Sequence, residues 1–217
     1  FPIGDPFVTQ TLDIPPEGFD LTNQGKIFTP FWDEPILLKR GEANWPPSTV
    51  DPKKGYIYVC AGERQAAYST QTDTDLATSG DRYTGGSMRF APVPTTGVVA
   101  AVNLRDNKVV WSQRWSSRCY SGLVASAGGL VFAGRNDGRF TAIDSENGRK
   151  LWEFMTDAGV NAPPATFQHE GEQYVAVLSA GNLIAGSKRG DSVWLFGLES
   201  AGIESAVEID QVTTPLS

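Results

Sequence analysis

Short apolar runs separated by turn-forming residues dominate the hydrophobic pattern of this chain. The runs are rich in Val, Ile, Tyr, Phe and Trp, and Gly, Pro, Asn or Asp bounds each of them. Helical periodicity is hard to find anywhere, so the pattern predicts β-strands. We expect strands over residues 55–62, 96–104, 108–115, 122–128, 129–134, 138–144, 150–156, 164–170, 173–181 and 192–198.

The connectors between these runs are short. "AGG", "RNDG" and "SENG" each place a Gly or Asn where a hairpin needs a positive φ. Strands joined by such tight turns pair in antiparallel meanders. The predicted fold class is therefore all-β.

One eleven-residue pattern occurs twice at a fixed spacing. "AVNLRDNKVVW" at residues 101–111 recurs as "AIDSENGRKLW" at residues 142–152, an offset of 41 residues. Both copies share a small residue, an Asn or Asp, a turn former and a Trp. A period of about 40–50 residues with four strands per unit is typical of a β-propeller.

The repeat can be explained by the packing of neighbouring blades. Asn107 and Gly148 supply the left-handed corner of the turn that follows the third strand of each unit. Trp111 and Trp152 then begin the fourth strand. A propeller blade packs its face on the next blade, and an indole wedged there buries about 150–250 Å². We expect these Trp residues to pack between blades rather than to take part in chemistry.

The repeat divides the chain into about three four-stranded antiparallel blades. One blade carries an insertion rich in Ser, Thr, Gly and Asp, and such long excursions often form lids or binding loops. The expected organisation is an edge strand and linker from a preceding blade (1–42), a blade with the insertion 62–95 (43–115), a second blade (116–157), an incomplete last blade (158–198) and a polar tail (199–217).

Composition narrows the function classes. Of the 217 residues, 40% are hydrophobic and 20% are charged, which describes a globular chain, and the net charge is −7. A nucleic acid or an anionic lipid surface needs a basic face, so neither is expected as a partner. No apolar run approaches the ~20 residues of a membrane span.

Two residue types are too scarce for several kinds of site. His169 is the only histidine and stands in a turn-like stretch, "FQHEGEQY". A Ser-His-Asp triad and a zinc site are therefore close to excluded. Cys60 and Cys119 are the only cysteines, and two cysteines leave open whether they pair.

Several motifs resemble a known family. "A-x-D-x-x-x-G-x-x-x-W" at 142–152 is similar to the tryptophan-docking motif of quinoproteins, the dehydrogenases that use pyrroloquinoline quinone (PQQ). The stretches "IFTPFWDEP", "ANWPPSTVDPKKGYIYVCAG", "GLVASAGGLVFAGRNDGRFTAIDSENGRKLWEF" and "GVNAPPATFQHEGEQYVAVLSAG" occur in this order. Together they look like the C-terminal portion of a quinoprotein alcohol dehydrogenase.

The resemblance implies an eight-bladed propeller with PQQ and a Ca²⁺ or lanthanide ion on its axis. In the family, the metal ligands and the catalytic Asp lie upstream of the matched region. We therefore expect no catalytic residue and no metal ligand in this chain. Three blades do not close a ring, so we expect a fragment, or one chain of a cleaved or split enzyme, with missing N-terminal blades or a companion chain as its partner.

The resemblance also carries three candidate cofactor-binding residues. Asn44, in "ANWPP", matches a position whose amide reaches the polar edge of the quinone. Trp45 follows it and either walls the pocket or packs between blades. Tyr120 stands where many members have a Trp that stacks on the quinone ring. This departure, and "AGNLIAGSKRGD" in place of a "GWGG"-like element, point toward sugar- or polyol-oxidising relatives rather than methanol dehydrogenases.

The expected function is participation in a periplasmic dehydrogenase that oxidises an alcohol, polyol or sugar. A hydride would pass to the quinone, and the electrons would pass to a cytochrome on another polypeptide or another part of the parent protein, because "C-x-x-C-H" is absent. One alternative is a non-catalytic propeller that acts as a protein-binding scaffold in the cell envelope. Another is a surface that binds sugars or polymers without catalysis.

Overall fold

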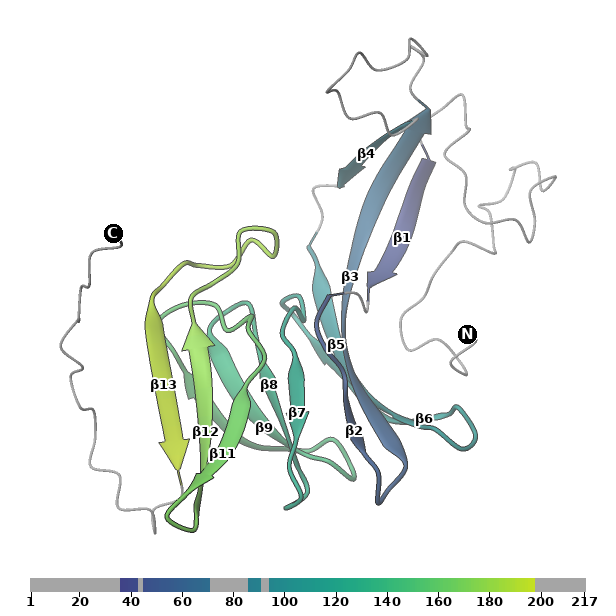
Figure 1. Cartoon of the computed structure of the whole chain (residues 1–217). Coiled ribbons are helices and arrows are strands. Elements are labelled where there is room, and N and C mark those ends of the chain that lie inside the picture. The colour runs from purple at the N-terminus through teal and green to yellow at the C-terminus, as the bar shows by residue number, and fades with distance from the viewer. Residues whose placement is uncertain (1–35, 43–44, 71–85, 91–93, 198–217) are drawn as a thin grey trace, which may run out of the picture.

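The computed structural model describes residues 36–42, 45–70, 86–90 and 94–197 (Figure 1). These residues form thirteen β-strands, and none of them lies in a helix. All pairs of neighbouring strands are antiparallel, in three sheets. The all-β prediction is confirmed.

The first sheet is built around one long strand. Its members are β1 (Ile36–Glu42), β2 (Thr49–Asp51), β3 (Tyr56–Thr70), β4 (Gly86–Phe90), β5 (Thr96–Asn103) and β6 (Val109–Trp115). The order β1-β3-β5-β6 forms the main path, and β2 and β4 also pair with β3. β3 therefore has two halves: β2 and β5 flank the first, and β1 and β4 flank the second.

The other two sheets are simple meanders. The second contains β7 (Leu123–Ala125), β8 (Leu130–Gly134), β9 (Arg139–Asp144) and β10 (Lys150–Met155), in the order β10-β9-β8-β7. The third contains β11 (Ala165–His169), β12 (Glu172–Ser179) and β13 (Ser192–Gly197), in that order. In Figure 1 the second sheet lies between the first and the third.

All ten strands expected from the sequence are present, and β1, β2 and β4 are additional. The insertion predicted over residues 62–95 begins inside β3, which runs on to Thr70, and β4 returns along it in register from Gly86 to Phe90. The described ends of this insertion are thus a strand pair that extends the first sheet, and residues 71–85 and 91–93 lie outside the description. The blade boundaries proposed from the sequence remain predictions.

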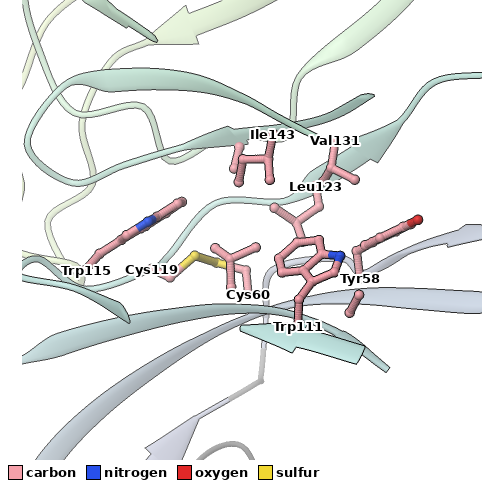
Figure 2. Packing of buried hydrophobic residues seen from close by; sticks show 11 residues of the cluster. Tyr58, Cys60, Trp111, Trp115, Cys119, Leu123, Val131 and Ile143 are labelled. Atoms are coloured by element: carbon pink, nitrogen blue, oxygen red, sulfur yellow. A yellow bond between two sulfur atoms is a disulfide. The ribbon is translucent and has the colours of Figure 1, made fainter. Parts of the chain in front are cut away.

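Two hydrophobic cores lie between the three sheets, one at each interface, and β8 contributes side chains to both. Val131 and Ala133 belong to the core shared with the first sheet, which Figure 2 shows from close by. Phe132 lies between them in sequence and belongs to the core shared with the third sheet. Successive side chains of a strand point to opposite faces, so one short strand stabilises both layers.

Trp111 lies at the interface between the first two sheets. It is 8% exposed, and its Nε1 donates a hydrogen bond to the Ser145 carbonyl oxygen at 3.0 Å. The Tyr58 hydroxyl donates to the same oxygen at 3.1 Å. At Gly148, φ is +76°, and a Cβ there would lie 2.7 Å from the Trp111 ring. Only glycine therefore allows the turn after β9 to fit against this indole.

Trp152, the second Trp of the repeat, has different surroundings. It is 41% exposed and contacts the rings of Phe140, Phe154 and Phe196. Phe196 lies on β13, so Trp152 also reaches the neighbouring sheet, but through aromatic contacts. The two copies of the repeat thus occupy equivalent strands and have unequal burial.

We expect Trp111 and Tyr58 to be energetically coupled, because they donate to one carbonyl oxygen. Trp111→Phe removes one donor and part of a buried ring, and should lower the free energy of unfolding by about 2 kcal/mol. Tyr58→Phe should cost about 1 kcal/mol. The double variant leaves this buried carbonyl without either donor and should cost about 1 kcal/mol more than the sum. Urea unfolding of the four proteins measures the coupling, and strictly additive losses would contradict it.

Candidate functional site

The segments that lead into β2, β7 and β11 meet at one end of the sheets. The Leu123 N–H donates a hydrogen bond to the Pro47 carbonyl oxygen at 3.1 Å. A Cβ on Gly122 would lie 2.6 Å from the Pro163 ring and 2.8 Å from the Pro47 ring. No larger residue fits at Gly122 without displacing these prolines. The three entry segments therefore pack on one another in the space that a side chain would fill.

A polar network joins the same end to two further turns. The Asn161 Nδ2 donates to the Tyr120 carbonyl oxygen at 3.1 Å and to the Asn136 Oδ1 at 2.6 Å. The Asn136 Nδ2 in turn donates to the Ala185 carbonyl oxygen at 2.8 Å. The Ser187 hydroxyl donates to the Asn161 Oδ1 at 2.6 Å. Four connecting segments are thus fixed to each other by side chains rather than by strand pairing.

Arg118 and Tyr120 form a cation–π pair within this end. The Arg118 guanidinium carbon lies 4.4 Å from the centre of the Tyr120 ring, and its Nη1 donates to the Ile184 carbonyl oxygen at 3.3 Å. Arg118 is only 6% exposed. Gly62 makes room for its side chain, because a Cβ there would lie 3.0 Å from the Arg118 Cγ. A positive charge is therefore held in place beside an aromatic face.

A disulfide bond attaches the segment that carries this pair to the first sheet. Cys119 stands between Arg118 and Tyr120, and it is bonded to Cys60 on β3 across a Cα–Cα distance of 5.6 Å. Both cysteines are buried, and Figure 2 shows the bond beside Trp115 in the first core. The pairing that the sequence left open is thus present.

This geometry can be compared with known proteins. The family model for the glucose/ethanol/alcohol dehydrogenase β-propeller domain, named PQQ, matches residues 69–175. The quinoprotein ethanol dehydrogenase of Pseudomonas aeruginosa is 32% identical over 174 residues, which cover 74% of this chain and 28% of that protein. The chain belongs to the PQQ-dependent quinoprotein alcohol dehydrogenase family.

Other quinoproteins are similar to this chain over comparable lengths. The 1-butanol dehydrogenase (quinone) of Thauera butanivorans is 30% identical over 201 residues, which cover 86% of this chain and 31% of the relative. The crystal structure of the quinohemoprotein alcohol dehydrogenase from Comamonas testosteroni superposes with a TM-score of 0.61 at 24% identity, over 80% of this chain and 28% of that one. The chain thus spans less than a third of the length of these quinoproteins.

The three predicted cofactor-binding residues differ in their positions and in the exposure of their side chains. Asn44 lies outside the described residues. Trp45 is 78% exposed in the segment before β2. Tyr120 is half-buried beneath Arg118. Among the described contacts, none joins Trp45 to Tyr120, although their segments meet through Pro47. Their roles in binding PQQ remain predictions.

Arg118 and Asn161 also lie at this end of the sheets, and neither was predicted from the sequence. Arg118 stands directly beside a cysteine in "SSRCYSG", which is the one signal that marks it.

In the part of the chain that the structure describes, no group of three or more His, Cys, Asp or Glu side chains is placed to hold a metal ion. No described helix has the length and apolarity needed to cross a membrane.

We expect the disulfide to make a large contribution to stability. It joins residues 59 positions apart, and loop-closure entropy for a loop of this size corresponds to about 4 kcal/mol. Cys60→Ala with Cys119→Ala should lower the free energy of unfolding by roughly that amount, measured by urea titration. Addition of a thiol reductant should have no further effect on the double variant. A loss below ~1 kcal/mol would contradict the estimate.

The carboxylate of Asp157, which follows β10, predicts a specific acid dependence. The Ser192 hydroxyl donates to the Asp157 Oδ2 at 2.7 Å and lowers the pKa of this carboxyl, with further contributions from Ser179 and Trp194. A carboxyl whose pKa is lower in the folded state stabilises the fold above its unfolded pKa of about 3.9, and this stabilisation is lost as the pH falls through the folded pKa.

Asp157→Asn should therefore be less stable than the parent chain at pH 7, and the difference should shrink toward pH 2. Urea midpoints at both pH values measure it, with Asp191→Asn as the charge-matched control. An unchanged difference between pH 7 and pH 2 would rule out this contribution of Asp157.

Proposed function

We propose that this chain forms part of a PQQ-dependent dehydrogenase that oxidises an alcohol, polyol or sugar. The end where the entry segments converge then supplies one side of the cofactor site. The observation that carries this proposal is the Arg118–Tyr120 pair, held there by a disulfide and a polar network. Family membership identifies the cofactor class that such a site would take.

The described residues fit one wall of a site for a planar, anionic quinone. The half-buried ring of Tyr120 offers a stacking surface, and the guanidinium of Arg118 contributes positive charge beside it. When bound, PQQ accepts the hydride equivalent from the alcohol carbon. This chain's own contribution is to bind and orient the quinone. The ligands of a Ca²⁺ or lanthanide ion are assigned to other parts of the complete enzyme.

The proposed partners of the chain are further blades, because its three sheets form only part of a ring. Three sheets do not close a propeller, and the outward face of the third sheet exposes apolar side chains on all its strands, namely Phe167, Leu178, Val193 and Leu195. Further blades, either N-terminal in the same protein or in a companion chain, are proposed to cover this face. The chain on its own is then not catalytic.

The proposal also includes an electron acceptor and a cellular compartment. The reduced quinone must be reoxidised after each turnover, and a cytochrome is proposed as the acceptor. The periplasm is proposed as the location, because structural disulfides persist in oxidising compartments. The buried Cys60–Cys119 bond supports this assignment.

The test has two arms. This chain supplied with PQQ and Ca²⁺ should show no dye-linked oxidation of ethanol, 1-butanol or glycerol, whereas the complete enzyme should oxidise at least one of them. Activity of the chain alone, or inactivity of the complete enzyme, would overturn the proposal.

Tyr120 provides the site-specific arm. In the complete enzyme, Tyr120→Ala should weaken PQQ binding about fivefold through the loss of ring contact, and Tyr120→Phe should retain it. Leu104→Ala, an exposed position in the turn after β5, is the control. Equal PQQ affinity in Tyr120→Ala and the control, measured by quinone absorbance, would remove Tyr120 from the site.

A further inference from the structure

Asn147 and Gly148, in the turn after β9, form the only Asn-Gly sequence in the chain. This pair is the one most prone to spontaneous deamidation, because glycine has no side chain to hinder attack of its backbone nitrogen on the asparagine side chain. Asn147 is exposed, and φ at Gly148 is +76°. The turn therefore holds both groups of an intramolecular reaction in adjacent residues, and the hydrogen bonds of each group decide whether they react.

The fold polarises the side-chain amide of Asn147. The Arg149 N–H donates to the Asn147 Oδ1 at 2.9 Å, and the Asn147 Nδ2 donates to the Asp144 Oδ2 at 2.9 Å. A donor on the amide oxygen stabilises the negative charge that develops there when a nucleophile adds to the amide carbon. The Arg149 N–H thus makes the Asn147 Cγ more susceptible to attack.

The attacking nitrogen, in contrast, is held back by the turn. The Gly148 N–H donates to the Asp144 carbonyl oxygen at 2.9 Å. The first sheet keeps the turn in this form, because the Trp111 ring lies against Gly148 and the Gln113 Nε2 donates to the Gly148 carbonyl oxygen. The nitrogen becomes available only when the turn opens, and opening releases these contacts.

We propose that Asn147 is a deamidation site whose rate is controlled by the contacts between the first and second sheets. The Gly148 nitrogen adds to the Asn147 Cγ, the bond from Cγ to Nδ2 breaks, and a succinimide ring forms. The proton of the Gly148 nitrogen leaves with Nδ2 as ammonia. Water then opens the ring at either carbonyl and gives aspartate or isoaspartate at position 147. The net change is the uptake of water and the loss of ammonia.

Both products alter the turn that contacts the first sheet. Hydrogen bonds from the Glu146 N–H and from Asn147 lower the pKa of the Asp144 carboxyl, which is therefore ionised at neutral pH. Aspartate at position 147 places a second carboxylate where the amide donor stood, and the two like charges repel. Isoaspartate lengthens the backbone just before Gly148, where even a Cβ would lie 2.7 Å from the Trp111 ring. Deamidation thus weakens the interface, independently of the proposed function.

Peptide mass spectrometry of the full chain after prolonged incubation at mildly alkaline pH tests the proposal. Trypsin releases Asn147 in the peptide 140–149 and Asn136 in the peptide 136–139, and each peptide contains no other asparagine. Asn147 should be converted to a mixture of aspartate and isoaspartate. Asn136, which also lies in a hairpin turn but precedes Asp137, should stay an amide. An unconverted Asn147, or equal conversion at both positions, would overturn the proposal.

Two variants test the control by the interface. Trp111→Phe should speed conversion on the order of tenfold, because the open turn becomes more populated. Tyr58→Phe removes one hydrogen bond to the Ser145 carbonyl oxygen and should speed conversion less, which keeps the test valid if Trp111→Phe does not fold. Val175→Ala, in the core between the second and third sheets, is the matched control and should leave the rate unchanged. Rates equal to that of the parent chain in both variants, or equal acceleration in the control, would overturn control by this interface.

The effect of the product is measured with Asn147→Asp. This variant should have a lower urea midpoint than the parent chain, because the added carboxylate stands beside Asp144. Gln168→Glu adds the same charge at an exposed position of β11 and should leave the midpoint unchanged. Equal midpoints in the two variants would overturn the coupling between deamidation and the interface.

Discussion

The carbonyl oxygen of Ser145 is the contact on which the arrangement of the first two sheets depends. It accepts hydrogen bonds from the indole of Trp111 and from the hydroxyl of Tyr58, two donors that come from different strands of the neighbouring sheet. Apolar packing alone is non-directional and tolerates sliding. A carbonyl shared by two buried donors fixes both the distance and the register between layers, so the loops at the ends of the strands keep constant positions relative to each other.

The end of the chain proposed to face the cofactor depends on these fixed positions. Its entry segments meet where Gly122 leaves space for two prolines, and the Asn161 amide joins the loops that precede and follow the second sheet. The Cys60–Cys119 bond then ties the Arg118–Tyr120 pair to β3. The side chains that would face a cofactor are thus positioned by covalent and polar links to the sheets and do not depend on the conformation of a free loop.

The strands were predictable where their side chains alternate or where β-branched and aromatic residues cluster, as in "KVVWSQRW" of β6. β1 was missed because "ILLKRGE" mixes two cations and a glycine into its apolar run, and β2 was missed because three residues carry no periodicity. Tyr120 was predicted as a cofactor-binding residue from its position in a family motif, and that role stays a prediction. Arg118 was not, because its location depends on Gly62, which is distant in sequence and adjacent only in the fold. The Cys60–Cys119 pairing was likewise open, since sequence separation says nothing about spatial distance.

The register places Tyr58 opposite Ala101 in the first sheet and Phe132 opposite Ala142 in the second, so Phe132 is the counterpart of Tyr58 without its hydroxyl. The sheets are therefore similar in register and differ in the polar contacts that this position makes. The first and second sheets share, among other hydrogen bonds, the two that the Ser145 carbonyl oxygen accepts, together with the packing of Trp111 against Gly148. The third sheet packs on the second through aromatic and aliphatic faces, and hydrogen bonds join these two layers as well: the Ser192 hydroxyl donates to the Asp157 Oδ2, and the Ala158 N–H donates to the Ser179 hydroxyl. Each pair of neighbouring layers is thus joined by an apolar core and by hydrogen bonds, so the loss of one polar contact at either interface leaves other links between the same two sheets.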